Sequence, residues 1–281
     1  MLKNQNDVFI ACDSSYEDAD TVIFGAPFDG TTSFRPGTRF AGKAIRGDSF
    51  GIETYSPYQD RDLCDISVFD AGDLELPFGN TQRVLELIEQ TADGIFADGK
   101  RPVMLGGEHL VTLGAVRSAV KKYPDLEIIH FDAHTDLREE YLGERLSHAS
   151  VIRRCWELVG DGRIHQFGIR SGEKYEFEFA SEHTYMHRFS LLDFPETVRR
   201  LKGKNIYFTL DLDVLDPAYF CGTGTPEPGG VTFRELLDAV LLLRGLNIIA
   251  FDINELSPHY DPSGASTAAA CKLLRELLLA V

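Results

Sequence analysis

Apolar positions along the 281-residue chain follow two periods. Short apolar runs have the length and β-branched composition of strands, and longer stretches between them carry apolar residues at helical spacing. Eight runs predict strands, at residues 21–25, 66–71, 102–105, 127–131, 164–169, 184–189, 205–212 and 247–253. The intervening stretches predict helices that start near residue 44 or cover residues 82–97, 110–122, 151–158, 192–201, 233–243 and 267–279.

Strands that alternate with helices predict an α/β fold, with a mostly parallel sheet that is covered on both faces. The sequence contains no repeat and no linker-like change of composition, so we expect one domain over residues 1–281. A closed eight-stranded barrel is the rival architecture, because the strand count alone does not exclude it. In open sheets of this class, chemistry gathers at the carboxyl ends of the strands.

The net charge indicates which kinds of binding partner the protein is expected to have. The chain has 28 basic and 44 acidic residues, a formal charge of -16. This balance disfavours nucleic-acid and membrane partners and modestly favours a cationic substrate. A generally acidic surface explains the charge equally well.

The cysteines and the N-terminus predict a cytoplasmic protein. The cysteines are odd in number, far apart and without a Cys-x-x-Cys pair: Cys12, Cys64, Cys155, Cys221 and Cys271. This argues against a disulfide framework and a zinc ribbon, and for a reducing compartment. Residues 1–7 lack the apolar stretch of a secretory signal, and no apolar run reaches the roughly 18 residues of a membrane span.

Side chains that can bind metal follow three of the predicted strands. Every second side chain of an extended segment shares a face, so the acids and histidine of Asp-Ala-His-Thr-Asp can converge, as can those of Asp-Leu-Asp. A further histidine follows a Gly-Gly pair. The six candidate ligands are His109, Asp132, His134, Asp136, Asp211 and Asp213.

The chemistry of these ligands predicts the metal. Four carboxylates at one place repel one another, and two divalent cations would cancel their charges. Oxygen-rich ligation with two imidazoles and no thiolate favours Mn²⁺ over structural Zn²⁺. A metal pair of this kind acidifies a bridging water into hydroxide, which is a hydrolytic device.

Five motifs resemble the signatures of the ureohydrolase superfamily of arginases and agmatinases. They are Gly-Gly-Glu-His at 106–109, Asp-Ala-His-Thr-Asp at 132–136, Ser-His-Ala-Ser at 147–150, Asp-Leu-Asp-Val-Leu-Asp-Pro at 211–217 and Asp-Ile-Asn-Glu at 252–255. They occur in the family's order and at similar intervals. The resemblance implies a three-layer α/β/α sandwich around an eight-stranded parallel sheet, and a homo-oligomer, commonly a trimer or hexamer.

The resemblance also implies two Mn²⁺ ions per subunit. One ion would be held by His109, Asp132, Asp136 and Asp211, and the other by Asp132, His134, Asp211 and Asp213, so that Asp132 and Asp211 bridge.

Three residues take catalytic roles by the same resemblance. Asp136 would pass a proton to the leaving amine, His148 would shuttle protons with a near-neutral pKa, and Glu255 would pair with the guanidinium group. The alternatives are that His148 caps a helix and that Glu255 pairs with an arginine. His130, within an apolar strand, is expected to be a hydrogen-bonded core histidine.

Loop sequences favour the agmatinase branch. Residues 25–29, 35–40 and 221–230 are similar to agmatinase loops, and residues 137–146 lack the arginase-type asparagine. We therefore expect hydrolysis of agmatine, a small cationic guanidino compound, to putrescine and urea. Cys221 and residues 41–43 differ from the residues that are usual at these positions of the agmatinase loops.

Other functions stay open at this point. A guanidinobutyrase, an arginase and a non-catalytic homologue are the alternatives within this fold. A single-zinc deacetylase of related fold is disfavoured, because the chain has no His-His pair.

Overall fold

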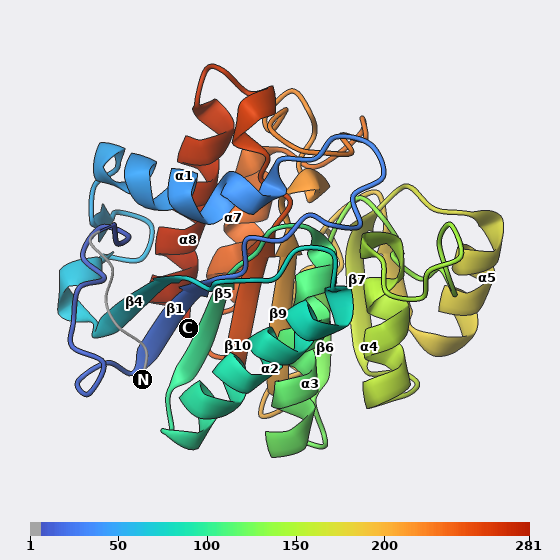
Figure 1. Ribbon diagram of the computed structural model, residues 1–281, viewed down its shortest axis with the longest axis horizontal. Coiled ribbons are helices and arrows are strands. Elements are labelled where there is room, and N and C mark those ends of the chain that lie inside the picture. Colours follow the sequence, from blue (N-terminus) through green and yellow to red (C-terminus); the bar gives the residue numbers. More distant parts are fainter. Residues whose placement is uncertain (1–6) are drawn as a thin grey trace.

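The computed structural model of the protein describes residues 7–281, so residues 1–6, which entered the expectation about a secretory signal, lie outside it. Its centre is an eight-stranded sheet (Figure 1). In spatial order the strands are β4 (Val68–Asp73), β1 (Thr21–Gly25), β5 (Arg101–Leu105), β10 (Asn247–Asn254), β9 (Asn205–Asp211), β6 (Glu127–Phe131), β7 (Ile164–Ile169) and β8 (Tyr185–Arg188). All neighbouring strands are parallel. The sheet is open, with β4 and β8 at its edges, so the prediction of an open sheet is confirmed and the closed barrel is excluded.

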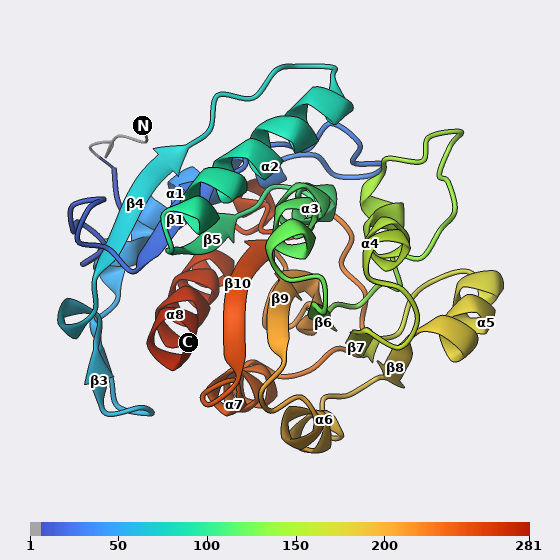
Figure 2. The ribbon, with the colours of Figure 1, turned by 90° about the horizontal axis from the view of Figure 1, so that it is seen from below.

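Helices cover both faces of the sheet (Figure 2). One layer contains α2 (Thr81–Ala97), α3 (Thr112–Lys122), α4 (Val151–Val159) and α5 (Lys174–His183). The other contains α1 (Ala41–Asp48), α6 (Phe194–Arg200), α7 (Phe233–Leu242) and α8 (Ala265–Ala280). Each layer encloses its own hydrophobic core against the sheet, which confirms the three-layer sandwich.

The strand β6 illustrates how the sequence builds these two cores. Ile129 and Phe131 face the core beneath α6, α7 and α8, and Ile128 faces the core beneath α2 and α3. The ring of Phe131 meets Phe167, Phe194 and Phe208 edge to face, with centroids 5.6, 4.9 and 5.2 Å away. Edge-to-face aromatic pairs add to the stabilisation from burial. Because both faces are covered, the strand is apolar at successive positions instead of alternating.

One helix and one short hairpin of the structure were not predicted from the sequence. Residues 174–183 form α5, but Tyr175, Phe177 and Phe179 alternate with acids in a pattern typical of a strand. The hairpin of β2 (Tyr55–Ser56) and β3 (Arg61–Asp62) is too short to give a periodic signal. The eight predicted strands match the observed ones to within two residues at each end.

Across residues 7–281, none of the helices combines the length and the apolar composition that crossing a membrane requires. The five cysteines are free, and Cys64 and Cys221 are exposed.

A buried ion pair joins α1 to the sheet edge. Nε of Arg46 donates to Oδ2 of Asp70 at 2.8 Å, and Nη2 donates to Oδ1 of the same carboxylate at 2.9 Å. Nη1 of Arg46 also pairs with Asp73 at 2.5 Å. The side chains of Arg46 and Asp70 are 2% and 0% exposed, so neither charge has bulk water as an alternative partner.

We expect Arg46→Met to lower the free energy of unfolding by about 3–5 kcal/mol, because the substitution leaves the Asp70 carboxylate buried without its cation. Urea unfolding followed by circular dichroism measures the change. Arg234→Met is the matched control, because Arg234 pairs with Asp238 on the surface, and its midpoint should not move. Equal midpoints for the two variants would show that the buried pair does not stabilise the fold.

Candidate metal centre

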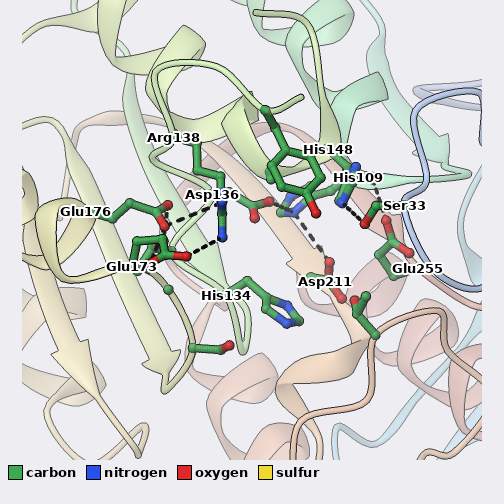
Figure 3. Close-up of a pocket in the computed structure, with 16 residues that line it drawn as sticks. Ser33, His109, His134, Asp136, Arg138, His148, Glu173, Glu176, Asp211 and Glu255 are labelled. Carbon is green, nitrogen blue, oxygen red and sulfur yellow. Dashed lines mark hydrogen bonds and ion pairs between the residues drawn. The ribbon is translucent and has the colours of Figure 1, made fainter. Parts of the chain in front are cut away.

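The four central strands β5, β10, β9 and β6 are neighbours; the candidate metal ligands lie at the carboxyl ends of β5, β9 and β6, and Glu255 follows β10. His109 opens a 3-10 turn after β5, and Asp211 ends β9. Gly107 allows the chain before His109 to pass close to the backbone of Phe28, because a Cβ there would collide with it. The resulting cavity has a volume of about 320 Å³, and several of its lining residues are drawn in Figure 3.

His109 lies at the centre of one group of predicted ligands. Its Nδ1 atom is 3.1 Å from Oδ2 of Asp132 and 3.1 Å from Oδ2 of Asp136. The same nitrogen is 3.4 Å from Oδ2 of Asp211. The structure thus brings together the four residues that the sequence assigned to one ion.

His134 lies at the centre of the second group. Its Nδ1 atom is 3.0 Å from Oδ2 of Asp213 and 3.4 Å from Oδ1 of Asp132. The two oxygens of Asp132 therefore face the two histidines, as a bridging carboxylate requires. Asp211 resembles Asp132 in one respect: its Oδ1 atom accepts the backbone N–H of Asp213 at 2.8 Å, as Oδ1 of Asp132 accepts that of His134.

A hydrogen-bond chain that the sequence analysis did not identify orients His109. The hydroxyl of Thr209 donates to Oδ1 of Asp252 at 2.6 Å, so its oxygen is left to accept Nε2–H of His109 at 2.9 Å. Tyr207 also donates to Asp252, at 2.6 Å. With its proton on Nε2, His109 would have its Nδ1 lone pair available to a cation held between this nitrogen and the carboxylates. The alternation of Tyr207, Thr209 and Asp211 along β9 was the signal that could have found this chain.

The electrostatics of the centre favour bound cations. Burial, and then the nearby Asp132, raise the pKa of Asp136 to about 7. Burial and Asp213 raise the pKa of Asp211 well above its usual range. Within residues 7–281, the four aspartates of the centre form ion pairs only with histidines. Divalent cations would let all four ionise together, so the residues present fit a metal centre.

Glu255 and Asp136 lie at the centre on strained backbone. Their φ angles are 66° and 52°, a left-handed conformation that few residues other than glycine adopt. Oε1 of Glu255 accepts the backbone N–H of His109 at 2.8 Å. Such strain is common where a side chain must be aimed at a functional site. The alternative that Glu255 pairs with an arginine has no support among the ion pairs of the described chain.

His148 lines the cavity, but its pKa differs from the expectation. Its backbone N–H donates to the hydroxyl of Thr31 at 3.0 Å, and its Nε2 atom lies 3.4 Å from the hydroxyl of Ser33. The ring of Tyr141 meets it edge to face. Burial lowers the pKa of His148 to about 4, far below the near-neutral value that was expected. The imidazole is therefore neutral at pH 7.

The outer part of the cavity contains residues that the sequence analysis missed. Nη2 of Arg138 is 3.4 Å from Oε1 of Glu173, and its guanidinium lies over the ring of Tyr141 at 4.7 Å. Glu176 also lines the cavity and accepts the hydroxyl of Thr135. Glu173 and Glu176, at the start of α5, were missed because this helix was not predicted.

Comparisons with known proteins agree with this geometry. A sequence model described as the Arginase family matches residues 19–280. An agmatinase of Bacillus subtilis (strain 168) is 49% identical over 276 residues, which cover 97% of this chain and 95% of that protein. A guanidinobutyrase of Pseudomonas aeruginosa is 32% identical, with 92% and 85% covered. A crystal structure of a Clostridium difficile protein assigned as an agmatinase is 54% identical, with a TM-score of 0.92 and 94% and 98% covered.

The lowered pKa of His148 predicts a pH-dependent contribution to stability. An exposed histidine has a pKa of about 6.5, so between about pH 6.5 and 4 the unfolded chain binds a proton that the folded chain resists. Stability of the wild type relative to His148→Gln should be constant above about pH 6.5 and should fall as the pH falls toward about 4. Urea unfolding at a series of pH values measures it, and a difference that does not change with pH would contradict the buried, neutral imidazole.

Proposed function

The chain belongs to the arginase family, and from this we propose that it is a binuclear manganese amidinohydrolase that converts agmatine and water to putrescine and urea. The observation that carries the proposal is the position of Asp132, whose two carboxylate oxygens face His109 and His134. The identity of about half of the residues to a bacterial agmatinase supports the choice of substrate.

Six residues would hold the two Mn²⁺ ions: His109, Asp132, His134, Asp136, Asp211 and Asp213. Four carboxylate and two imidazole ligands without a thiolate suit Mn²⁺. When bound, such a pair of ions lowers the pKa of a water molecule and so provides a nucleophile at neutral pH.

Glu255 would bind and orient the guanidinium group. The N–H of His109 fixes one of its oxygens, so the carboxylate cannot rotate freely. Burial, and then Asp213, raise the pKa of Glu255 well above its usual range. A guanidinium cation in the cavity would favour the ionised form and gain a charge-assisted hydrogen bond.

Asp136 and His148 would handle protons. Asp136 would accept a proton from the attacking water and pass it to the amine nitrogen as the C–N bond to urea breaks. His148, with a pKa of about 4, is neutral at pH 7 and would hold a proton only transiently while relaying it between the site and solvent. Its position beside Ser33 and Tyr141 at the cavity wall supports this role.

The outer cavity favours agmatine over guanidino acids. A substrate with a carboxylate tail needs a cation there, but Arg138 is already paired with Glu173 and stacked on Tyr141. A substrate with an ammonium tail meets the acidic side of the same pair. A guanidinobutyrase remains the second candidate, because one such enzyme is 32% identical to this chain.

The proposal extends to the domain, the oligomer, the location and the pathway. We propose one ureohydrolase domain over residues 1–281 and a homo-oligomer, a trimer or hexamer, for which the 92% exposed Phe78 and the 84% exposed Leu142 offer apolar contact surface. Free cysteines are typical of reducing compartments, which supports a cytoplasmic location. With agmatine as substrate the amine product is putrescine, so the enzyme would act in polyamine biosynthesis.

A substrate panel tests the choice of substrate. Urea release by the Mn²⁺-loaded protein should be fastest with agmatine, with kcat/KM at least about 100-fold higher than for guanidinobutyrate or arginine, because a carboxylate tail would meet the acid of the Arg138–Glu173 pair. Activity on arginine with none on agmatine would overturn the proposal. A metal-loaded protein that is inert on all three compounds would favour a non-catalytic homologue.

Removal of one ligand tests the two-metal arrangement. We expect Asp213→Ala to lower the manganese content from two ions to about one per chain and to abolish nearly all turnover, because Asp213 faces only the His134 group. Elemental analysis after gel filtration, together with urea release, measures both effects. Asp238→Ala, on the outer surface of α7, should keep both ions and full activity. Full activity of Asp213→Ala with one ion bound would contradict the scheme.

A further inference from the structure

His130 is a buried histidine whose two ring nitrogens both have partners. It is 0% exposed within β6, and its register partner on β7 is the equally buried Gln166. Nε2 of His130 lies 2.8 Å from Oδ2 of Asp132, and Nδ1 lies 3.1 Å from Nε2 of Gln166. His130, His109 and Asp132 are close enough to form a possible metal-binding group, so His130 is either a ligand or a support.

The hydrogen bonds around Gln166 determine where the His130 proton lies. The amide nitrogen of Gln166 donates to the backbone carbonyl of Thr135 at 2.9 Å, and a carbonyl oxygen can only accept. The hydroxyl of Thr184 donates to the amide oxygen at 3.0 Å, which agrees with this orientation of the amide. The second N–H of the amide therefore points to Nδ1 of His130, which must accept it. The ring proton of the neutral imidazole is then on Nε2, which donates to Asp132.

This arrangement leaves His130 no lone pair for a cation, because Nε2 carries the proton and Nδ1 accepts from Gln166. The Asp132 carboxylate is instead held at both oxygens. Oδ2 accepts from His130, and Oδ1 accepts the backbone N–H of His134 at 2.5 Å. These are the two oxygens that face the ring nitrogens of His109 and His134.

We propose that His130 is a positioning residue, which Gln166 fixes as an Nε2–H donor so that the Asp132 carboxylate stays aimed at both metal positions. The proposal rests on the proposed function in one respect, the assignment of Asp132 as a metal ligand. It predicts that loss of the N–H donor at this position weakens metal retention even where the fold and all six ligands are intact.

A chelator challenge on the full chain tests the proposal. The Mn²⁺-loaded wild type, His130→Phe and His130→Gln are mixed with excess EDTA, and bound manganese is measured at timed intervals. His130→Phe keeps the ring but removes the donor, and should lose manganese about 10–100-fold faster than the wild type. His130→Gln can place an amide N–H where Nε2 was, and should restore retention close to that of the wild type.

His165→Phe is the matched control. His165 is 1% exposed on β7, and its Nε2 atom bonds a carboxylate that is not a predicted ligand, that of Glu127, at 3.0 Å. This variant should unfold at a lower temperature but retain manganese as the wild type does. If His165→Phe loses manganese as fast as His130→Phe, the effect is general destabilisation and the proposal is overturned.

A spectroscopic measurement reads the proton position directly. In the metal-free ¹⁵N-labelled protein, two-bond ¹H–¹⁵N correlations should show His130 with its proton on Nε2, and a proton on Nδ1 would overturn the proposal. A wild type that retains no manganese would overturn the proposed function, and the assignment of Asp132 with it. A wild type and a His130→Phe variant that retain manganese equally would overturn only the inference about His130.

Discussion

The repulsion among four buried aspartates is the constraint on which the site depends. Asp132, Asp136, Asp211 and Asp213 meet at the carboxyl ends of two neighbouring strands, at most 7% exposed. A folded chain tolerates such a group only with compensating positive charge or with bound protons. Burial and the nearby Asp132 raise the pKa of Asp136 to about 7, which is the direction expected where such charges are left uncompensated. Divalent cations would complete the balance, and with a bound hydroxide the site would be complementary to a guanidinium cation.

Hydrogen bonds from the surrounding structure fix the orientation of the side chains at the centre. Carboxylates without fixed orientation would rotate away from one another, but here each oxygen of Asp132 accepts an N–H. The chain from Asp252 through Thr209 does the same for His109. These partners are held by neighbouring strands that are covered by helices on both faces, so their positions are as fixed as the hydrophobic cores. The ligands therefore lie at or just beyond the ends of fixed strands, and the loops around Ser33, Tyr141 and Glu173 would carry the groups that meet substrate.

Much of the fold was predictable from the sequence, because strands buried on both faces leave long apolar runs and the helices between them are amphipathic. The six candidate ligands were also predictable, since they occupy alternate positions immediately after three strands. The roles of Thr209, Asp252 and Gln166 were not, because each depends on which strands become neighbours. The pKa of His148 depends on burial by a distant loop, that of Thr31 and Ser33. The helix α5 was hidden because Tyr175, Phe177 and Phe179 imitate the period of a strand, and Glu173 and Glu176 were missed with it.

The position of β10 in the sheet has a consequence for how the site comes into existence. This strand is the last in the chain, yet it lies between β5 and β9, which carry His109 and Asp211 at their ends. Before β10 is inserted, no strand joins β5 to β9. Glu255 directly follows β10, so it reaches the centre together with this strand. A nascent chain that ends before residue 247 therefore cannot have assembled the complete site. The pairing that closes it spans about 150 residues, the kind of distant contact that slows folding. A metal centre of this kind would therefore be complete only after β10 has been synthesised and has paired with β5 and β9.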